Sequence, residues 1–510
     1  MIYLKLLFSL LIPLLLGWTI VALVLKKETA AAAIERLAWS WGLGTVFLTS
    51  IMFVLLCLKI PLTLINIMIP VAIYLTISLA VIVKKHYPLF DPEEEWGTLS
   101  LLEKLLLIAI SGKVLYVGFE ALIKPVVAWD AWTSWAFKSK IFFFNNVPLI
   151  SYFRDYPIGI VDYPLHLPLL ETWIFNCLGT WNDQLVKVIF PIYFLSLLLA
   201  VFYGLRRLTN RYQALLFTFI LSALPLLTYH ATIEYADLLL ACYFACGIIL
   251  LYLWMVKQKD GLLWLSALFL GCLPLLKKEG LLFLIIAPGM LLYYFVISRS
   301  NISWEGGRRK FVLFVTICLL IPAPWFIFKK VMDIRALSGQ TPYLPAADVL
   351  AQRLISIGQI FIKKMFVEGN WNILWFIFLL TTLIYFKRII NSTARFLFYI
   401  ILINIGILIV IYLLTDSFAF LLDGTTLNRN MLTLVPIVVF FIALIIPLTE
   451  RREMMTNSAS TAAGPDARAR RATGASAGRR RRPRVGRGGP GEISPSSQRM
   501  LRTMKIGRHP

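Results

Sequence analysis

Asp130 lies among three tryptophans in the stretch VVAWDAWTSWAFKSKIFFFNN, residues 126–146. Trp129, Trp132 and Trp135 recur every third residue, a spacing that would place the three indoles on one side of a helix. Such a stripe is typical of a short helix that lies at the headgroup level of a membrane. The pattern therefore predicts an interfacial helix with a carboxylate at its start.

The polar residues of this stretch follow a different spacing. Asp130, Ser134 and Lys138 stand four residues apart, so a helix would turn them toward water or toward the rest of the protein. Two interpretations stay open. The charges are solvated beside an interfacial anchor, or the carboxylate is a base that takes a proton from a substrate at the water interface.

A second polar stretch, VDYPLHLPLLETWIF, occupies residues 161–175 at the entry to an apolar run. Its two prolines are incompatible with a regular helix at that point. We therefore expect the segment to fold back at the membrane surface beside Asp130, although a plain loop descending into a helix has the same pattern. The polar candidates in it are Asp162, Tyr163, His166 and Glu171.

A third group, His230, Glu234 and Asp237, is spaced i, i+4 and i+7, which would place it on one helix face. These residues could coordinate a divalent metal, contact a sugar or acceptor, or simply mark a helix start with Asp237 near its N-terminus. No further clear ligand accompanies them, so no metal site is assigned. Cys242 and Cys246 share a helix face but are expected, like the other cysteines, to be small core residues.

The elements that position these residues are membrane helices. Of 510 residues, 59% are hydrophobic and 15% are charged, whereas soluble domains have about a quarter charged residues. Apolar runs of roughly 17 to 25 residues can cross a bilayer as helices. The sequence predicts an all-α polytopic membrane protein, whose first helix is retained because no cleavage site follows it. The expected helices are 2–25, 37–58, 60–83, 101–123, 185–205, 212–229, 237–256, 262–276, 281–297, 311–328, 371–386, 396–414 and 431–448.

Basic residues fall in alternate loops, which the positive-inside rule assigns to the cytoplasm. This pattern predicts thirteen crossings, with the N-terminus outside and the C-terminus inside. The opposite loops include the external segments 124–184, 329–370 and 415–430, which carry acids, aromatics and prolines. Because chemistry often resides in loops held by a rigid scaffold, we expect the site to face away from the cytoplasm.

The net charge of +23 divides between the membrane body and the tail at 451–510. That tail has fifteen Lys/Arg and three Asp/Glu, which gives it +12. The remaining positive charge lies in short loops, where the positive-inside rule relates it to the side of the membrane on which each loop lies. The net charge is therefore not read as a sign of nucleic-acid binding. The Arg/Gly-rich tail is expected to be disordered. It either binds anionic lipid or has no role.

Several motifs occur in a characteristic order. After a membrane helix come the Trp–Asp loop, DYPLHLPLLE, EYADLLLACYF at 234–244, KKEGLLFLIIAPG at 277–289 and RNMLTLVPIVVFF at 429–441. In this order the chain resembles the GT-C glycosyltransferases, specifically the bacterial relatives of protein O-mannosyltransferases and lipid A aminoarabinose transferases. The resemblance covers about residues 100–450.

The resemblance implies a GT-C-type fold with amphipathic interfacial helices in the first large external loop. Three expected membrane helices within 1–100, where the better-known members of the family have one, precede the expected catalytic core at 101–450, and the tail at 451–510 is separate. Enzymes of this kind take a sugar from a polyprenyl-phosphate carrier on the non-cytoplasmic face, here of a bacterial plasma membrane. The acceptor is a protein, lipid or glycan. The family's catalytic aspartate carries over to Asp130, and Asp162 remains its rival because three helices precede the loop.

The chemistry that this implies is simple. A sugar on a phosphate already has a good leaving group, so the reaction needs a base for the acceptor hydroxyl and cations for the departing phosphate. Direct displacement would invert the anomeric carbon. The cations expected to bind the phosphate are Arg429, Lys278 and Lys138; Arg429 has the alternative role of a headgroup anchor, and Lys278 that of a local ion pair. The expected sugar or acceptor pocket comprises Asp162, Tyr163, His166, Glu171, Glu234, Asp237 and Glu279.

Two other classes of function remain as alternatives. A lipid or glycan transporter would place charges near the bilayer midplane on broken helices, whereas the acids here concentrate in external loops. A structural membrane protein would account for the apolar body but not for the external acids.

Overall fold

The computed structural model describes residues 1–26, 31–89, 97–145, 161–297, 304–334 and 343–447. Within these ranges the chain is all-helical and has no β-strand, as the composition predicts. The tail at 451–510 lies outside the described residues.

Nine helices in the described ranges are long and apolar enough to cross a membrane, and a bent pair, α14 and α15, makes a tenth span if counted as one. The chain is therefore an integral membrane protein. The nine spans are α1 (Ile2–Leu25), α2 (Ala33–Cys57), α3 (Leu64–Lys85), α4 (Leu101–Ile123), α8 (Ile189–Arg206) with the preceding 3-10 turn η2 (Leu185–Val188), α11 (Ala236–Lys257), α13 (Gly280–Ile297), α18 (Arg395–Leu414) and α20 (Leu427–Ile445). The bent pair is α14 (Trp304–Leu320) and α15 (Ala323–Val331).

The expected helices all appear, but the count of thirteen crossings is not confirmed. Besides the bent pair, three of the expected spans are short or interrupted. Pro225 divides one of them into α9 (Arg211–Ser222) and α10 (Pro225–His230), because proline cannot continue the hydrogen bonding of α9. The others are α12 (Asp260–Leu276) and α17 (Leu374–Ile390), which has non-helical backbone angles at Tyr385.

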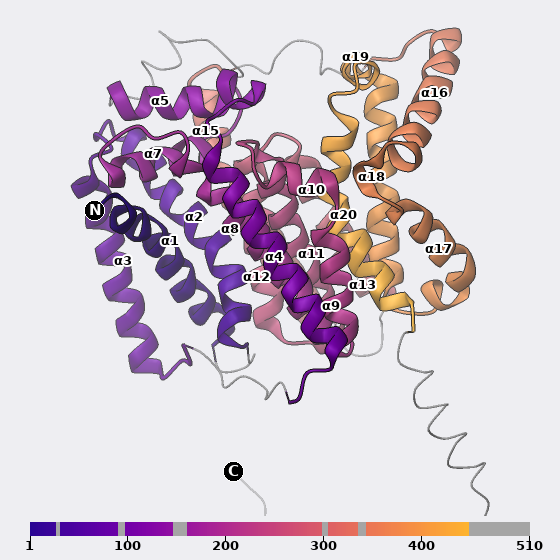
Figure 1. The fold of residues 1–510 in the computed structure, drawn as a ribbon, viewed down its shortest axis with the longest axis horizontal. Helices are drawn as coiled ribbons and strands as arrows, with labels where there is room; N and C mark the ends of the chain where they lie inside the picture. The colour runs from indigo at the N-terminus through magenta and orange to yellow at the C-terminus, as the bar shows by residue number, and fades with distance from the viewer. Residues whose placement is uncertain (27–30, 90–96, 146–160, 298–303, 335–342, 448–510) are drawn as a thin grey trace, which may run out of the picture. The chain divides into compact units, whose positions relative to one another are not determined.

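The segments expected as external loops contain short helices. The first segment holds the π-helical turn η1 (Ala131–Trp135), α5 (Ala136–Asn145) and α7 (His166–Leu178). The others hold α16 (Ala347–Ile362), η3 (Lys363–Val367), η4 (Gly369–Trp371) and α19 (Ser417–Leu422). Figure 1 shows α5 lying across the direction of the long helices, at the same end as α7, α15 and α19. This orientation agrees with an interfacial helix.

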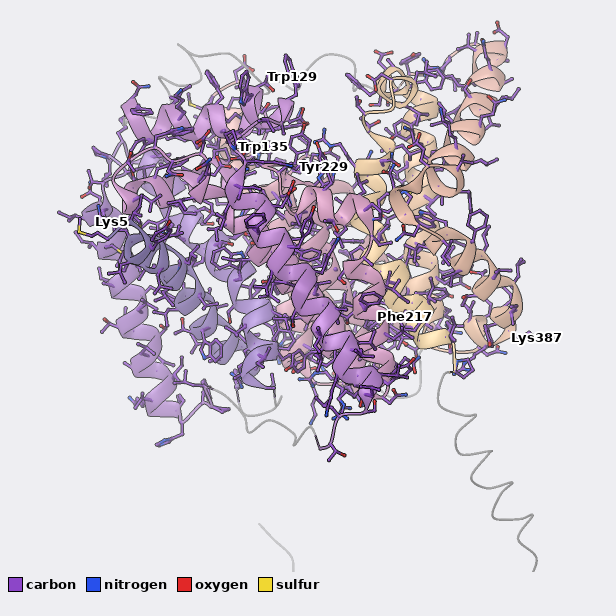
Figure 2. The ribbon with its side chains drawn as sticks, viewed as in Figure 1. Lys5, Trp129, Trp135, Phe217, Tyr229 and Lys387 are labelled. Atoms are coloured by element: carbon purple, nitrogen blue, oxygen red, sulfur yellow. The ribbon has the colours of Figure 1, made fainter. Side chains whose placement is uncertain are left out.

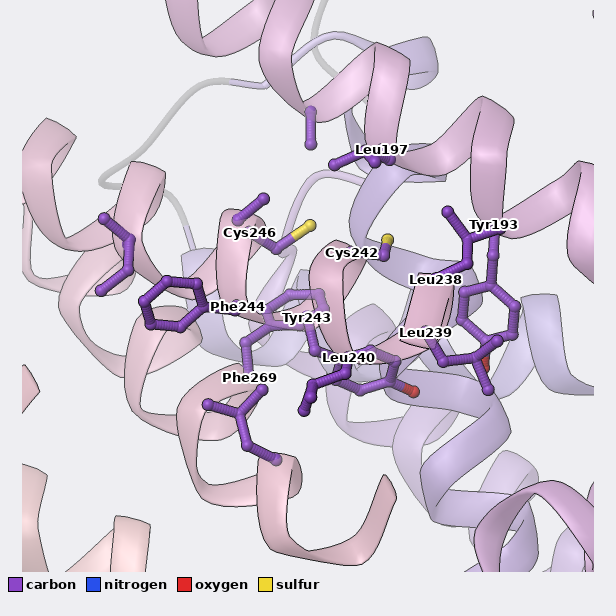
Figure 3. Close-up of a cluster of buried hydrophobic side chains, with 14 of the residues drawn as sticks. Tyr193, Leu197, Leu238, Leu239, Leu240, Cys242, Tyr243, Phe244, Cys246 and Phe269 are labelled. Carbon is purple, nitrogen blue, oxygen red and sulfur yellow. The ribbon is translucent and has the colours of Figure 1, made fainter. Parts of the chain in front are cut away.

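The core is centred on α11, which packs against α8, α12 and α20 and is almost wholly buried. Figure 3 shows its apolar side chains between those of α8 and α12, among them Tyr243 against Phe269. Cys242 and Cys246 are buried and free, as expected for small core residues. Because α11 is surrounded by other helices, the residue in its first turn, Asp237, is held in a fixed place.

Helices α1 and α2 approach each other closely through glycine. A Cβ atom at Gly17 would lie 1.8 Å from the carbonyl oxygen of Ser40, and one at Gly44 would lie 1.7 Å from that of Pro13. Small residues at such crossings allow the two backbones to touch, which is a common way of joining helices in lipid. The N-terminal helices are thus packed firmly onto the rest of the bundle.

Ion pairs join helices at the end of the bundle opposite to α5. Arg207, which follows α8, forms an ion pair with Glu35 of α2, with Nε 2.6 Å from Oε1. Arg211 of α9 forms an ion pair with Glu103 of α4, with Nε 2.7 Å from Oε1. Glu35, Arg207 and Arg211 belong to loops expected on the cytoplasmic side, and Glu103 lies in the first turn of α4. Two of the loops that the alternation makes cytoplasmic, at Glu35 and at 206–211, therefore lie together.

Candidate functional site

Three elements that are distant in sequence bring Asp130, Asp237 and Arg429 together. The guanidinium of Arg429 contacts Asp130 through Nη1 and Oδ2 at 2.6 Å and Asp237 through Nη2 and Oδ2 at 2.9 Å. Asp237 lies in the first turn of α11, where a helix favours negative charge. Arg429 lies in the first turn of α20, where a helix disfavours positive charge, so the two carboxylates compensate for its position.

Lys277 joins this group from the end of α12. Its Nζ atom lies 2.9 Å from Oδ1 of Asp237 and 3.1 Å from Oε1 of Glu279. The chain leaves α12 in an extended conformation at Lys277 and enters α13 at Gly280. A Cβ atom at Gly280 would lie 2.1 Å from the carbonyl oxygen of Leu273, so this tight passage requires glycine. We call Asp130, Asp237, Glu279, Lys277 and Arg429 the Asp130 cluster.

Tyr235 supports the Asp130 cluster and was not predicted from the sequence. Its hydroxyl accepts a hydrogen bond of 3.4 Å from the backbone N–H of Asp130. Its ring also lies 4.7 Å from the guanidinium carbon of Arg429, in cation–π geometry. Tyr235 therefore helps to fix both the aspartate and the arginine. The signal for it was weak, because one tyrosine before a membrane helix is common at interfaces.

A neighbouring group contains Asp162, Lys278 and Lys138. Lys278 pairs with the buried carboxylate of Asp162 at 2.5 Å, and its ammonium lies 5.0 Å from the ring centre of Tyr163. Lys138 is fully buried and donates a hydrogen bond of 3.1 Å to the carbonyl oxygen of Tyr163. We call Asp162, Lys138 and Lys278 the Asp162 cluster. The adjacent residues Lys277 and Lys278 thus connect the two clusters.

Burial affects the two buried lysines in different ways. It would lower the pKa of Lys277, but the carboxylates of Asp237 and Glu279 outweigh it and raise that pKa above the usual value. Burial lowers the pKa of Lys138 to about 7, although Asp162 acts in the opposite direction. Lys277 therefore holds its charge firmly, whereas the charge of Lys138 is sensitive to any anion that arrives nearby.

The tryptophan stripe is only partly confirmed. Trp129 and Trp132 are 73% and 64% exposed, as an interfacial anchor requires. Trp135 is buried and stacks on Tyr163 with ring centres 5.0 Å apart. The prediction for Trp135 was wrong because residues 131–135 form a π-helical turn, which is wider than an α-helical turn and rotates the third indole inward. Figure 2 shows Trp129 at the rim of the molecule and Trp135 deeper in it.

The prediction that His230, Glu234 and Asp237 share one helix face was wrong. His230 is the last residue of α10, Glu234 lies in the following turn, and Asp237 belongs to α11. Burial lowers the pKa of His230 to about 4, so its imidazole is neutral. No group of three or more His, Cys, Asp or Glu within the described ranges is placed to hold a metal ion.

Glu171 and Glu234 are both buried and influence each other. Burial raises the pKa of Glu171 to about 8, and burial together with the charge of Glu171 raises the pKa of Glu234 to about 9. Both side chains are therefore mainly protonated at neutral pH. A protonated carboxyl can donate a hydrogen bond to a ligand oxygen as well as accept one.

His166 faces the interior of the bundle. Its Nδ1 atom lies 2.8 Å from the hydroxyl of Thr49, and its Nε2 atom lies 3.2 Å from that of Tyr193. Burial lowers its pKa to about 3, so the ring is neutral. Helix α7 starts at His166, before Pro168, which corrects the expectation that the prolines exclude a helix there. The correction has a simple cause, because the first-turn N–H groups of a helix have no intrahelical partner to lose.

No protein-family model matches the chain, and no curated protein matches it in sequence. The chain is similar in structure to ArnT from Cupriavidus metallidurans in the apo state, with 15% identity and a TM-score of 0.44 over 70% of this chain and 62% of ArnT. It is also similar to that ArnT bound to undecaprenyl phosphate, with 13% identity and a TM-score of 0.45 over 71% of this chain and 64% of ArnT.

This chain thus spans less than two thirds of the length of the ArnT structures that it matches. Both similarities have TM-scores below 0.5. They are distant similarities of fold, and they assign no residue role, substrate or reaction to this chain.

Proposed function

We propose that this chain is a membrane glycosyltransferase that moves a sugar from a polyprenyl-phosphate carrier to an acceptor hydroxyl on the non-cytoplasmic face, with inversion. The observation that carries the proposal is the bridge from Arg429 to both Asp130 and Asp237, beside the buried Lys277. Charged groups buried at the end of a membrane bundle are expensive, and they are usually functional.

Asp130 is the proposed general base. Of the two carboxylates held by Arg429, Asp130 is 21% exposed, whereas Asp237 is 2% exposed. An acceptor arriving from water can therefore reach Asp130 and not Asp237. Arg429 and the Tyr235 hydroxyl orient the Asp130 carboxylate and its backbone, and Asp237 fixes Arg429 from the buried side. Positioning of this kind is what a base needs in order to accept a proton during the displacement.

The cations proposed for the phosphate divide between the two clusters. Arg429 belongs to the Asp130 cluster, and Lys278 and Lys138 belong to the Asp162 cluster. We place the sugar between the clusters, with its anomeric carbon toward Asp130 and its phosphate toward the lysines. The cations then neutralise the charge that develops on the leaving phosphate.

The other predicted pocket residues remain proposed contacts for the sugar or the acceptor. Asp162, Tyr163 and Glu279 lie within the two clusters or beside them. Asp237 has the positioning role given above. Glu171 and Glu234, as protonated carboxyls, are candidates for binding sugar hydroxyls. His166 points into the bundle and would act through Thr49 and Tyr193.

One feature fits the alternative of a lipid or glycan transporter. The pair α14 and α15 is bent by 42°, and transporter sites commonly use broken membrane helices. The ion pairs, however, lie at helix ends and not along the spans, which favours an interfacial reaction.

Transfer in detergent solution separates the two functions, because a transporter needs two compartments and an enzyme does not. Purified protein would be given a carrier lipid with a radiolabelled sugar and a cell-envelope extract as the source of acceptors. We expect the label to move to an acceptor with the wild type and not with Asp130→Asn, while Glu120→Gln, a change at a half-buried carboxylate that pairs with Lys124 outside both clusters, behaves as the wild type. Carrier flipping in proteoliposomes without any transfer in detergent would refute the enzyme and support the transporter.

A further inference from the structure

Lys113 has an unusual place among the charged residues of the membrane spans. It is the thirteenth of the 23 residues of α4. At 1.5 Å per residue it lies about 18 Å from the first residue of the helix and about 15 Å from the last. Every other Asp, Glu, Lys or Arg in the nine described spans is one of the first or last four residues of its span. A charge in the middle of a membrane helix is costly and usually serves a function.

An ion pair sets the depth of Lys113 in the bundle. Arg211 in the first turn of α9 pairs with Glu103 in the first turn of α4, so both helices start at the same level. Figure 1 shows α4 running obliquely over the outside of the bundle, and α4 and α9 are in contact. Lys113 lies ten residues beyond this pair, and Ser222 at the end of α9 lies eleven residues beyond it. The two residues are therefore at a similar depth, inside the apolar layer.

A groove of about 370 Å³ lies between α4 and the end of α9 at this depth, and Lys113 lines it. The lining also includes four small residues, Ala109, Gly112, Ser222 and Ala223. A Cβ atom at Gly112 would meet no other atom of the described chain within 4 Å, so this part of α4 is uncovered. Small residues on the surface of a membrane helix allow a second helix to approach closely. The groove is therefore suited to a further helix.

Lys113 has no anionic partner among the residues that the structure describes. Its ammonium lies 5.4 Å from the centre of the Tyr116 ring, and no carboxylate of the described ranges forms an ion pair with it. An aromatic ring compensates an ammonium group only in part. An ammonium without a counter-charge is unfavourable in the apolar layer. The groove thus presents a positive charge that an incoming group can neutralise.

The charge of Lys113 selects among three kinds of occupant. A lipid chain fills an apolar groove but brings no charge, and lipid phosphates lie at the membrane surfaces, farther away than a lysine at this depth reaches. A second copy of this chain brings no carboxylate to this depth, because the acids of the described spans lie near the span ends. A symmetric contact through the groove would also bring two Lys113 residues together. A foreign membrane helix with a carboxyl group at its middle supplies the missing charge.

We propose that the groove between α4 and α9 binds a transmembrane helix of a partner protein, and that a carboxyl group at the middle of that helix pairs with Lys113. The small residues of the groove contact the backbone of the partner helix, and the pairing fixes its depth. This interaction is independent of the proposed function, because Lys113 belongs to neither the Asp130 cluster nor the Asp162 cluster.

Model transmembrane peptides test the pairing directly. Full-length protein in lipid vesicles would carry a donor fluorophore and be titrated with an acceptor-labelled leucine–alanine peptide of about 20 residues. The peptide would have one glutamate at its centre, or one glutamine in its place. We expect the wild type to bind the glutamate peptide about tenfold more tightly, the size of one polar contact between membrane helices. This preference should disappear in Lys113→Met and persist in Lys104→Met, a matched change at the exposed start of α4.

Two further variants test the charge and the groove separately. Lys113→Glu should reverse the preference, so that a peptide with a central lysine binds more tightly than the glutamate peptide. Gly112→Leu should weaken binding of the glutamate peptide because it fills the groove. Gly118→Leu, at another open position of α4 that does not line the groove, should bind as the wild type.

Three results would overturn the proposal. Equal affinity of the wild type for the glutamate and glutamine peptides would remove the pairing. Energy transfer between two differently labelled samples of this protein, lost in Gly112→Leu, would assign the groove to a second copy. An anionic lipid retained by the wild type in native mass spectrometry, and not by Lys113→Met, would assign Lys113 to a lipid headgroup. None of these measurements involves sugar transfer, so the failure of this interaction and the failure of the transferase are distinguishable.

Discussion

The two ends of the helix bundle both bury ion pairs, but they organise them differently. At the end with the basic loops, Arg207 donates hydrogen bonds of 2.6 and 2.7 Å to the two carboxylate oxygens of Glu35. Arg211 likewise donates hydrogen bonds of 2.7 and 3.0 Å to the two carboxylate oxygens of Glu103. At the end with α5, Asp237 is shared by Arg429 and Lys277, and each of these cations has a further carboxylate.

The difference indicates two uses of charge. A bidentate pair satisfies both partners and fixes the ends of two helices, here α2 to α8 and α4 to α9. A network with shared partners can exchange one of them for a ligand without leaving a buried charge alone. The basic end is therefore suited to holding the fold, and the opposite end is suited to binding and chemistry.

The largest effect is expected for Asp237→Ala. This change removes the buried carboxylate that Lys277 and Arg429 share and leaves each cation with only its more exposed partner, Glu279 or Asp130. Breaking such a buried pair lowers stability by about 3–5 kcal/mol. Thermal unfolding in detergent measures the loss, with Glu120→Gln, a change outside both clusters, as the control. An unchanged melting temperature would mean that Asp237 does not hold the network together.

Glu35→Gln should also lower stability, by about 1.5–3 kcal/mol, because hydrogen bonds to a charged group are lost. Unlike changes in the Asp130 cluster, it should leave the rate of sugar transfer per folded molecule unchanged. The test is to measure the melting temperature and the rate of sugar transfer on the same sample. A large loss of the transfer rate in a sample that is normally folded would show that the basic end also takes part in the reaction.

Arg429→Lys probes the shared network more gently. A lysine keeps the charge but lacks the planar fork that contacts Asp130 and Asp237 at once. We expect sugar transfer to fall by about tenfold or more, which corresponds to losing about one charge-assisted hydrogen bond, with a small change in melting temperature. Full activity in the variant would show that the bridge between the two aspartates is dispensable.

The smallest effect is expected from pH. The pKa of Glu171 is raised to about 8 and that of Glu234 to about 9, so between the unfolded value near 4.5 and these values the folded state binds more protons than the unfolded state. Stability contributed by their neutral forms is present at low pH and is lost as pH rises through 8 to 9. The melting temperature of the wild type should therefore fall from pH 7 to pH 9.5.

Replacing both carboxyls by Glu171→Gln and Glu234→Gln should flatten this dependence, since an amide does not titrate. An equal pH dependence of the melting temperature in the wild type and in the double variant would contradict the raised pKa of both groups.

Much of the fold follows from the sequence alone. The ends of the apolar runs predict the main helices within a few residues, because a stretch without charges leaves the chain no other stable arrangement in lipid. The alternation of basic loops likewise predicts that Asp130, Asp237 and Arg429 lie at one end of the bundle. It does not predict their contacts, since these depend on how α11 and α20 pack.

Details that depend on local winding were not predictable. The π-helical turn that buries Trp135, and the break between α10 and α11 that separates His230 from Asp237, both change which residues share a face. The choice between the adjacent lysines depends on the residue at which α12 ends. The two lysines are adjacent in sequence, but Lys277 pairs with Asp237 and Lys278 pairs with Asp162. Spacing rules assume one helical period and therefore fail at such junctions.

The most direct test of the central claim is the single-turnover rate of sugar transfer for Asp130→Asn and Asp162→Asn, measured side by side with saturating carrier. Removing a general base lowers the rate by about 10²–10⁴-fold, and we predict this loss for Asp130→Asn. We expect Asp162→Asn to keep most of the rate, because its carboxylate spaces lysines and accepts no proton. Full transfer by Asp130→Asn together with its loss in Asp162→Asn would contradict the account and make Asp162 the base.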